Sequence, residues 1–380
     1  MAEDPIASQI DPVHDYLSRE ASAGRFPGAA WRVEEEGRVL SRGSVGWATL
    51  DPERETVGEA TPYDLASLTK PLVTAWLAVD LEREGKLELD APASRYLPEL
   101  RRGPYATATL VDLAAHRSGL PPWRPLYLVA GSVDEYVRAI AETAPIGSHG
   151  NTVYSDLGFV LLGAVLERAG GDSLDLLFQR RIAEPLELER TGFARTGSRA
   201  FVDAAASEAG NQFESERSGE PGRDHSWRPT IPRGEVHDGN AHGLGGVAGH
   251  AGLFGTAPDL ARMCREILRP KVLPWGGHRR DLLLHPVGGR GTRTFGWVPA
   301  VESGAAKGVL PDDAPGHTGF TGTSVWLDPK LDQIFVLLTN RVHPLVPSSD
   351  FQAIRREFHR AAVGMTRGGS PSSSAFGARP

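Results

Sequence analysis

The sequence predicts an α+β protein whose sheet is assembled from both ends of the chain. Three observations predict it. Residues 29–48 have the pattern of a β-hairpin, apolar residues recur at helical spacing through the middle of the chain, and β patterns return after residue 294. The simplest arrangement pairs N- and C-terminal strands in one antiparallel sheet. The helical middle is then a lobe inserted beside the sheet, with a cleft between the two lobes.

The first elements are a helix and a hairpin. Residues 11–25 predict a helix that Pro27-Gly28 ends, and the hairpin at 29–48 turns at Glu36-Gly37. From residue 65 to Gly85 the apolar period becomes helical, through Leu68, Leu72, Trp76 and Val79.

The remaining elements follow in order. Helical segments are expected at about 109–116, 132–143, 155–169 and 172–184, and a long polar surface loop at 205–235. Strands are expected at 295–298, 323–327 and 333–339, followed by a helix at 349–362. The Ser-, Gly- and Pro-rich end of the chain predicts disorder.

These elements predict one discontinuous sheet domain, a helical lobe and a tail. The sheet lobe takes residues 11–85 and 290–365, the helical lobe with its cleft loops takes 86–289, and the disordered tail takes 366–380.

Composition excludes several classes of protein. The 380 residues carry 41 Lys+Arg and 48 Asp+Glu, and this net charge of -7 argues against a nucleic-acid binder. The single cysteine, Cys264, excludes an intramolecular disulfide and a cysteine-based zinc site. Its amphipathic helical surroundings predict a buried structural thiol rather than a nucleophile.

The N-terminal residues also carry an expectation about location. Met-Ala-Glu-Asp-Pro is acidic and lacks the apolar stretch of a signal peptide, and no apolar run approaches the ~18 residues of a membrane span. We therefore expect a cytoplasmic protein without a membrane partner. The oligomeric state is not readable from the sequence.

The strongest chemical signal is Ser67-Leu68-Thr69-Lys70 at the start of the expected helix. Positions i and i+3 of a helix face the same way, so the Lys70 amine can reach the Ser67 hydroxyl. A serine needs a base to become a nucleophile, and a lysine can be that base when burial or nearby positive charge lowers its pKa. The alternative is a helix-capping Ser67 with Lys70 on a solvated face.

Two further segments could complete such a site. Tyr154-Ser155-Asp156 stands at the head of an apolar helix, and a tyrosine hydroxyl beside a lysine can relay protons. Gly316 to Phe320 precedes a strand, where small residues let a substrate lie along the strand edge and backbone N–H groups can bind an oxyanion. The alternatives are a helix cap with a packing tyrosine and an ordinary glycine-rich turn.

Competing sites are weaker. His237, Asp238, His242 and His250 have the spacing of possible zinc ligands, but their segment is a glycine-rich loop without a His-Glu-x-x-His motif. Residues 243–248 loosely match a dinucleotide fingerprint without the strand that must precede it. There is no P-loop and no Gly-x-Ser-x-Gly motif. The sequence therefore predicts neither a metal nor another cofactor.

Taken in order, the three segments resemble the penicillin-recognising serine hydrolases. The resemblance is closest to the class C β-lactamase-related group, which includes esterases, D-aminopeptidases and D,D-peptidases. It extends over roughly residues 25 to 362. Further segments that resemble this group are Glu84–Pro92, Leu113–Leu120 and Ala248–Ala257.

The resemblance implies a β-lactamase/D,D-peptidase-like fold, with a five-stranded antiparallel sheet flanked by helices beside an all-helical lobe. It also implies catalytic roles. Ser67 would form an acyl-enzyme, Lys70 and Tyr154 would share the proton transfers, and the N–H groups of Ser67 and Phe320 would hold the oxyanion. The residues expected to bind substrate are Asp156, His250, His317, Thr318, Gly319 and Phe320.

Two departures from the family pattern affect the expected substrate. Asp156 replaces an asparagine that donates its amide to substrate, and His317 replaces a lysine that pairs with a substrate carboxylate. We therefore expect a serine acyl hydrolase of small esters, amides or peptides. The alternatives are a β-lactamase or D-Ala-D-Ala carboxypeptidase, and a non-catalytic penicillin-binding-like sensor. A carboxylate bound by a His317 imidazolium would lose affinity as the pH rises through about 6.5.

Overall fold

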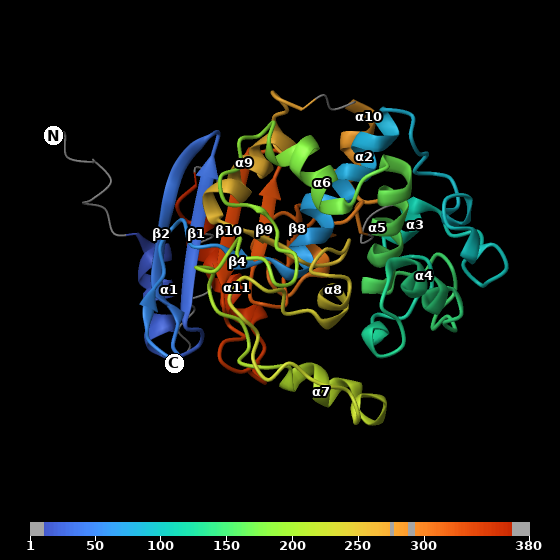
Figure 1. Ribbon diagram of the computed structural model, residues 1–380. Helices are drawn as coiled ribbons and strands as arrows, with labels where there is room; N and C mark the ends of the chain where they lie inside the picture. The colour runs from blue at the N-terminus through green and yellow to red at the C-terminus, as the bar shows by residue number, and fades with distance from the viewer. Residues whose placement is uncertain (1–10, 274–276, 288–292, 367–380) are drawn as a thin grey trace, which may run out of the picture.

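The central element is a seven-stranded antiparallel sheet with the order β3-β2-β1-β10-β9-β8-β7 (Figure 1). The structure is a computed structural model that describes residues 11–273, 277–287 and 293–366. The strands are β1 (Gly28–Glu35), β2 (Arg38–Thr49), β3 (Glu55–Thr56), β7 (Val298–Pro299), β8 (Pro315–Thr318), β9 (Ser324–Asp328) and β10 (Gln333–Thr339). The expected disordered tail lies almost wholly outside the described residues.

The α+β fold is confirmed, but the expected number of five strands is wrong. The two extra strands, β3 and β7, have two residues each and lie at the two edges of the sheet. The expected strand at 295–298 is reduced to Val298–Pro299, since the chain bends at Gly296, where φ is +92°. Such short edge pairings leave no alternating pattern in the sequence.

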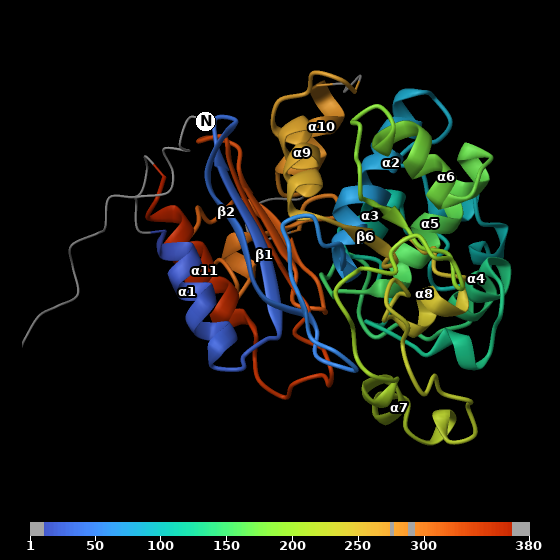
Figure 2. The ribbon, with the colours of Figure 1, turned by 60° about the vertical axis from the view of Figure 1, so that its left-hand side comes forward.

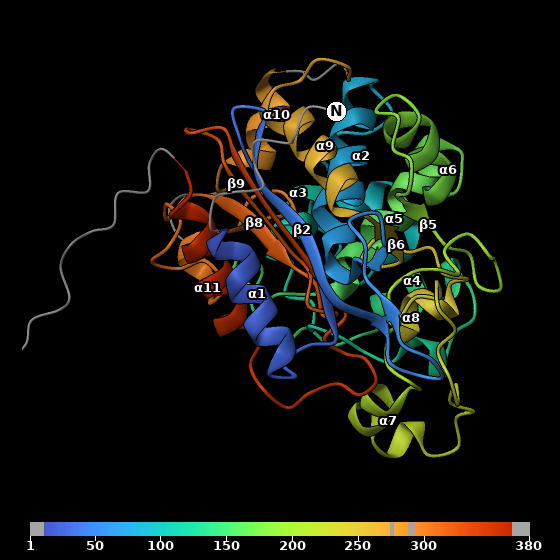
Figure 3. The ribbon, with the colours of Figure 1, turned by 90° about the vertical axis from the view of Figure 1, so that its left-hand side faces the viewer.

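The two ends of the chain meet in the pairing of β1 with β10, where Trp31 lies opposite Leu337 and Val33 opposite Phe335. All seven residues of β10 are buried, because helices cover both faces of the sheet. Phe335 and Leu337 pack with α1 (Pro12–Ser22) and α11 (Gln352–Val363). The residues that alternate with Phe335 and Leu337 along β10 belong to the larger hydrophobic core on the other face of the sheet. Figures 2 and 3 show α1 and α11 together on one side of the sheet.

The other side of the sheet carries the helical part of the chain. Its helices are α2 (Ala75–Arg83), α3 (Leu110–Ala114), α4 (Val133–Ala141), α5 (Asp156–Gly170), α6 (Leu174–Phe178), α7 (Gln212–Ser218), α8 (Gly239–Gly243), α9 (Ala257–Leu268) and α10 (Gly277–Leu284). The predicted helical lobe includes α9, but α9 packs against β1 and β10 and carries the buried Cys264. The boundaries of the two lobes stay a prediction.

Two details position the segment with Ser67. A small sheet pairs β4 (Tyr63–Asp64), just before it, with β6 (Leu253–Gly255), which also pairs with β5 (Gly192–Phe193). The helix expected from residue 65 is divided into a 3₁₀ turn at Ala66–Leu68, a π turn at Lys70–Thr74 and α2. Pro71 has no N–H for a regular α-helical bond to Ser67, and this favours the irregular turn.

The loop expected at 205–235 contains α7, which lies apart from the main body at the bottom of Figure 1. No helix in the described ranges has both the length and the apolar character needed to cross a bilayer.

Candidate active site

Ser67 lies between β4 and α2, in a turn that three side chains hold in place. The Asp64 carboxylate accepts the Ala66 N–H at 2.9 Å, the Thr69 hydroxyl donates to the Ala66 carbonyl at 2.7 Å, and the Thr323 hydroxyl donates to the Leu65 carbonyl at 3.2 Å. Ala66 has a φ of +46°, a conformation that an alanine adopts only when its surroundings enforce it. The turn therefore fixes the direction of the Ser67 side chain.

The Lys70 side chain contacts the Ser67 hydroxyl. Its fully buried Nζ donates to Ser67 Oγ at 2.9 Å and to the His250 carbonyl at 3.0 Å, and lies 2.7 Å from Asp156 Oδ1. Burial lowers the pKa of Lys70, but the Asp156 carboxylate and Tyr154 together outweigh burial and the pKa is raised. Lys70 is therefore an ammonium group at neutral pH.

Tyr154 approaches Ser67 from the head of α5, with its hydroxyl donating to Ser67 Oγ at 2.9 Å. Burial and the Asp156 carboxylate raise the pKa of Tyr154, while the ammonium of Lys70 opposes them. The His116 ring packs on Tyr154 with 4.6 Å between ring centroids, and its Nδ1 accepts the Ser155 N–H at 3.0 Å. Tyr154 is thus a neutral phenol in a fixed position.

The segment between β8 and β9 faces Ser67. A Cβ at Gly319 would lie 2.1 Å from Thr323 Oγ1 and 2.6 Å from the Leu65 carbonyl oxygen, so only glycine lets this segment approach the Ser67 turn. Arg355 donates to the Gly319 carbonyl at 2.6 Å and Arg341 to the Phe320 carbonyl at 2.9 Å. The carbonyls of the segment are therefore held by two arginines.

Two backbone N–H groups are suited to an oxyanion. Ser67 lies in the first turn of its 3₁₀ helix, where a backbone N–H has no acceptor within the helix. In the part of the chain that the structure describes, no group accepts the N–H of Phe320. Both residues line the same cleft.

The His317 side chain is less suited to binding a carboxylate than the sequence suggested. Its ring is buried, and its Nδ1 lies 2.8 Å from the Thr318 carbonyl oxygen. Burial, followed by the positive charges of Arg293 and Lys70, holds the pKa of His317 well below its usual value. This low pKa favours a neutral His317 in the free protein, and binding of a substrate carboxylate by a His317 imidazolium stays a prediction.

Arg293 supplies the positive charge that His317 lacks. Its guanidinium lies 5.1 Å from the centroid of the Tyr154 ring, and it lines the cleft. Its Nη1 is buried without a hydrogen-bond partner among the described residues. Sequence reasoning missed Arg293, because it is one of several arginines in a glycine-rich segment without a motif.

The cleft has a volume of about 460 Å³. Of the expected site residues, it brings together Ser67, Tyr154, Asp156, His317, Thr318, Gly319 and Phe320. It also contains residues that were not among the expected site residues, including Trp123, Glu214, Arg217, Asp238 and Arg293.

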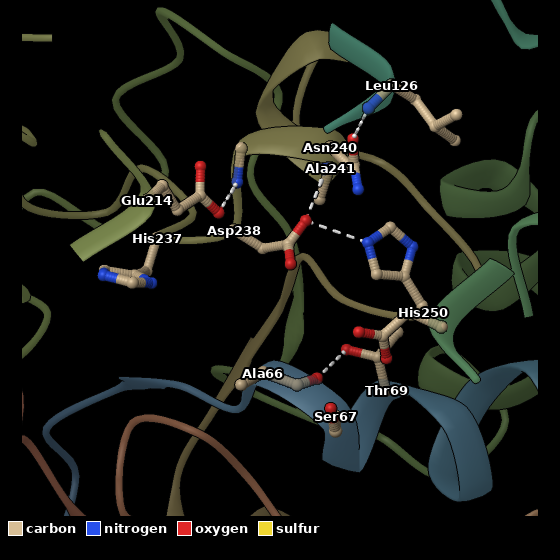
Figure 4. Close-up of polar contacts among 12 residues, drawn as sticks. Ala66, Ser67, Thr69, Leu126, Glu214, His237, Asp238, Asn240, Ala241 and His250 are labelled. Atoms are coloured by element: carbon tan, nitrogen blue, oxygen red, sulfur yellow. Dashed lines mark hydrogen bonds and ion pairs between the residues drawn. The ribbon is translucent and has the colours of Figure 1, made fainter. Parts of the chain in front are cut away.

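The His250 side chain was expected to bind substrate, but it lies outside the cleft. Its backbone carbonyl accepts Lys70 Nζ, while its buried side chain does not line the cleft and contacts Asp238 Oδ1 at 2.9 Å (Figure 4). Among the described residues there is no group of three or more His, Cys, Asp or Glu side chains that could hold a metal ion.

A family model described as Beta-lactamase matches residues 13–357 of the chain. An N-acetylmuramyl-L-alanine amidase of Bacillus subtilis (strain 168) is 30% identical over 376 residues, which are 88% of this chain and 81% of the relative. Esterase EstB of Burkholderia gladioli is 30% identical over 385 residues, with 89% and 91% covered. A putative D-alanyl-D-alanine carboxypeptidase of Escherichia coli (strain K12) is 28% identical over 377 residues, with 88% and 83% covered.

Solved structures share the fold. EstCE1, a hydrolase with promiscuous acyltransferase activity, superposes with a TM-score of 0.73 at 21% identity, covering 94% of this chain and 98% of the other. A class C beta lactamase from Rhodobacter sphaeroides superposes with a TM-score of 0.68 at 21% identity, covering 92% and 98%.

Proposed function

The chain belongs to the beta-lactamase family of serine hydrolases, and we propose that it hydrolyses small esters, amides or peptides through an acyl-enzyme on Ser67. One observation carries this assignment. Ser67 Oγ lies 2.9 Å from both Lys70 Nζ and the Tyr154 hydroxyl, so the nucleophile and two groups able to move protons meet at one atom.

The ion pair of Lys70 with Asp156 determines where the Ser67 proton goes. Because Lys70 is already protonated, it accepts this proton only as it passes one of its own to Asp156, 2.7 Å away. Lys70 and Asp156 therefore act together as the base, and Asp156 is the final acceptor. A carboxylate can take this part, whereas the asparagine of the family pattern cannot.

The acyl group of the substrate is then transferred to Ser67. Ser67 Oγ bonds to the acyl carbon, and the carbonyl electron pair moves to an oxygen held by the N–H groups of Ser67 and Phe320. The bond to the leaving group breaks as Tyr154 gives its proton to the leaving oxygen or nitrogen, and Lys70 returns a proton to Tyr154. Asp156 then returns its proton to Lys70, which restores the ion pair. Water cleaves the acyl-enzyme by the same transfers, which releases a carboxylic acid and restores Ser67.

Arg293 favours a second, narrower candidate, a peptidase or β-lactamase acting on substrates that carry a carboxylate. The guanidinium is a cation beside Tyr154, Arg293 lines the cleft, and its Nη1 has no hydrogen-bond partner among the described residues. A carboxylate there would supply the missing hydrogen-bond acceptor. Carboxylated and uncarboxylated substrates therefore both belong in the test.

The test measures turnover of p-nitrophenyl esters, D-amino-acid p-nitroanilides, a D-Ala-D-Ala peptide and nitrocefin. We expect at least one of them to be hydrolysed, and we expect Ser67→Ala to lower its kcat by at least about 10³-fold. Intact-mass spectrometry should show the acyl adduct on the wild-type chain and not on Ser67→Ala. The exposed Ser198→Ala is the matched control and should keep full activity.

Two results would contradict the proposal. Turnover that persists in Ser67→Ala would place the chemistry elsewhere. A long-lived adduct on Ser67 without turnover of any substrate would instead favour a penicillin-binding-like sensor.

A further inference from the structure

Two carboxylates lie close together in one wall of the cleft, outside the groups assigned to catalysis. Glu214 belongs to α7, and Asp238 is the residue before α8 (Figure 4). They belong to one cluster, because Glu214 Oε1 accepts the N–H of Gly239 at 2.7 Å and Asp238 is the N-cap of the same short helix.

Each carboxylate has one oxygen that no hydrogen-bond donor among the described residues contacts. Asp238 Oδ1 accepts the Ala241 N–H at 2.8 Å and contacts His250 Nε2 at 2.9 Å, while no described residue donates to Oδ2 of the same side chain. Glu214 is 5% exposed, and its Oε2 is buried without a hydrogen-bond partner in the described part of the chain. A buried carboxylate oxygen without a donor is costly, and a bound ligand could supply that donor.

The charged neighbours of the pair are bound to other groups. Within the described ranges, no Lys or Arg lies at ion-pair distance from Glu214 or Asp238. Arg228 donates to the carbonyls of Val236 and His237, at 2.9 and 2.7 Å. The ring of His237 pairs with Glu208 at 2.8 Å.

The titration of Glu214 agrees with an unfilled cation site. Burial and the nearby Asp238 raise the pKa of Glu214 to about 7, against the opposing charges of His237 and Arg228 and the Gly239 N–H. Two tyrosines also face Glu214, namely Tyr127, whose hydroxyl interacts with the Glu214 side chain, and Tyr136. Burial raises the pKa of both, so both are neutral phenols.

We propose that Glu214 and Asp238 form a subsite for an ammonium group on the acyl side of the substrate. The preferred substrate class is then esters, amides and short peptides of amino acids with a free amino group. This inference rests on the proposed function. A protonated amine would donate to Glu214 Oε2 and Asp238 Oδ2, which pairs both carboxylates and satisfies the buried oxygen.

The position of the subsite relative to the chemistry supports the acyl side. Arg293 and Tyr154 lie on the side from which the leaving group is protonated. Asp238 is connected to Ser67 through other residues. Its side chain contacts the His250 ring, the His250 carbonyl accepts Lys70 Nζ, and Lys70 Nζ donates to Ser67 Oγ. Arg293 and the two carboxylates therefore line the same cleft as Ser67, and this cleft also contains Arg217, Arg341 and Arg355.

The first test compares substrates that differ only in the amine. Alanine p-nitroanilide, as both enantiomers, is compared with propionic acid p-nitroanilide. We expect kcat/KM to be roughly 10- to 100-fold higher for the preferred alanine enantiomer, the range of a charged hydrogen bond. Glu214→Gln keeps an acceptor for the Gly239 N–H but loses the charge, so it should reduce this ratio about tenfold.

The control is Glu216→Gln on the same helix, where the carboxylate is exposed and outside the cleft. It should leave the ratio unchanged. The pH dependence gives an independent readout. As the pH falls below about 7, Glu214 takes up a proton and KM for the alanine substrate should rise, while KM for the propionyl substrate stays flat.

A binding measurement keeps the inference testable without turnover. In the Ser67→Ala protein at pH 7.5, calorimetry should show alaninamide binding roughly tenfold more tightly than propionamide, and Glu214→Gln should remove the difference. Equal affinity for the two amides, or a difference that survives in Glu214→Gln, would overturn the subsite. Failure of the proposed function is a separate result, namely ester turnover that does not depend on Ser67.

Discussion

Asp156 changes the electrostatics of the nucleophile more than any other side chain of the site. Its Oδ1 lies 2.7 Å from Lys70 Nζ, and this contact holds Lys70 in the charged form although the lysine is fully buried. A lysine that burial alone acts on would have a lowered pKa and could serve as a free base. In the mechanism that we propose, the base is therefore an ion pair, and the pH dependence of the reaction should show it.

We predict that Asp156→Asn changes the pH profile of the enzyme. Without the carboxylate, Lys70 has no group to which it can pass a proton, and burial lowers its pKa. We expect kcat at pH 7 to fall by about 10²–10⁴-fold, the loss of a positioned proton acceptor, and to recover as the pH rises and Lys70 becomes neutral. Stopped-flow acylation rates from pH 6 to 10 measure this.

The exposed Asp224→Asn controls for the loss of one negative charge and should keep the wild-type profile. An unchanged acylation rate and pH profile in Asp156→Asn would remove Asp156 from the proton path.

At the scale of elements, the site depends on the close approach of the β8–β9 segment to the Ser67 turn. Thr323 donates to the Leu65 carbonyl at 3.2 Å, and the Thr321 hydroxyl donates to the Asp64 carbonyl at 2.7 Å. These contacts set the position of the Phe320 N–H relative to Ser67. A small displacement of the segment would therefore misplace one donor of the oxyanion site.

We predict that Gly319→Ala separates the two elements. The new Cβ would lie 2.1 Å from Thr323 Oγ1 and 2.6 Å from the Leu65 carbonyl, so the segment must move away. We expect kcat to fall by about 10²–10³-fold, the usual cost of losing an oxyanion donor, with a smaller change in KM. Steady-state kinetics together with a thermal melt measure both effects.

Gly58→Ala serves as the control, because its Cβ would meet nothing closer than 3.8 Å. A normal kcat in a stable Gly319→Ala protein would show that the approach of this segment does not matter for catalysis.

At the scale of the whole molecule, the two chain ends are joined through β1 and β10, and α11 covers the joint. His359 of α11 is fully buried there, with its Nδ1 2.8 Å from the Ala305 carbonyl oxygen. Its ring packs against the rings of Trp326, Phe335 and Phe358. Burial lowers the pKa of His359 to about 4, so this apolar contact holds a neutral imidazole.

We predict that His359 makes the fold sensitive to acid. Above pH ~6.5 both states carry a neutral ring, but below it the unfolded chain binds a proton that the folded chain refuses until about pH 4. Stability should therefore decrease as the pH falls, with His359 contributing about 2 kcal/mol between pH 7 and pH 5. Urea denaturation at the two pH values measures the difference.

His359→Asn keeps a donor for the Ala305 carbonyl and removes the titrating ring. It should be less stable at pH 7 but lose about 2 kcal/mol less on going to pH 5. The exposed His14→Asn should keep the wild-type dependence on pH. An equal loss in all three proteins would show that His359 does not cause the acid sensitivity.

Local patterns in the sequence were enough for the fold class, most helices and the order of the motifs. The strand at 333–339 follows from a continuous run of apolar residues, which is typical of a strand buried on both faces of a sheet. The pairing of the two chain ends was the simplest arrangement of the expected strands, and β1 does pair with β10. Ser67, Lys70 and Tyr154 were identified from their spacing and from a family resemblance, and the structure brings their side chains together.

Tertiary structure alone decided the charges of the site. The charge states of Lys70 and His317 depend on neighbours that are distant in the sequence. The positions of Arg293, Glu214 and Asp238 in the cleft depend on such neighbours as well. A pKa is set by burial and by charges within a few ångströms, and neither quantity has a local signature in the chain. The sequence by itself thus determined the fold and identified the serine that we propose as the nucleophile, while folding determined which charged groups lie beside that serine and how charge is distributed along the cleft.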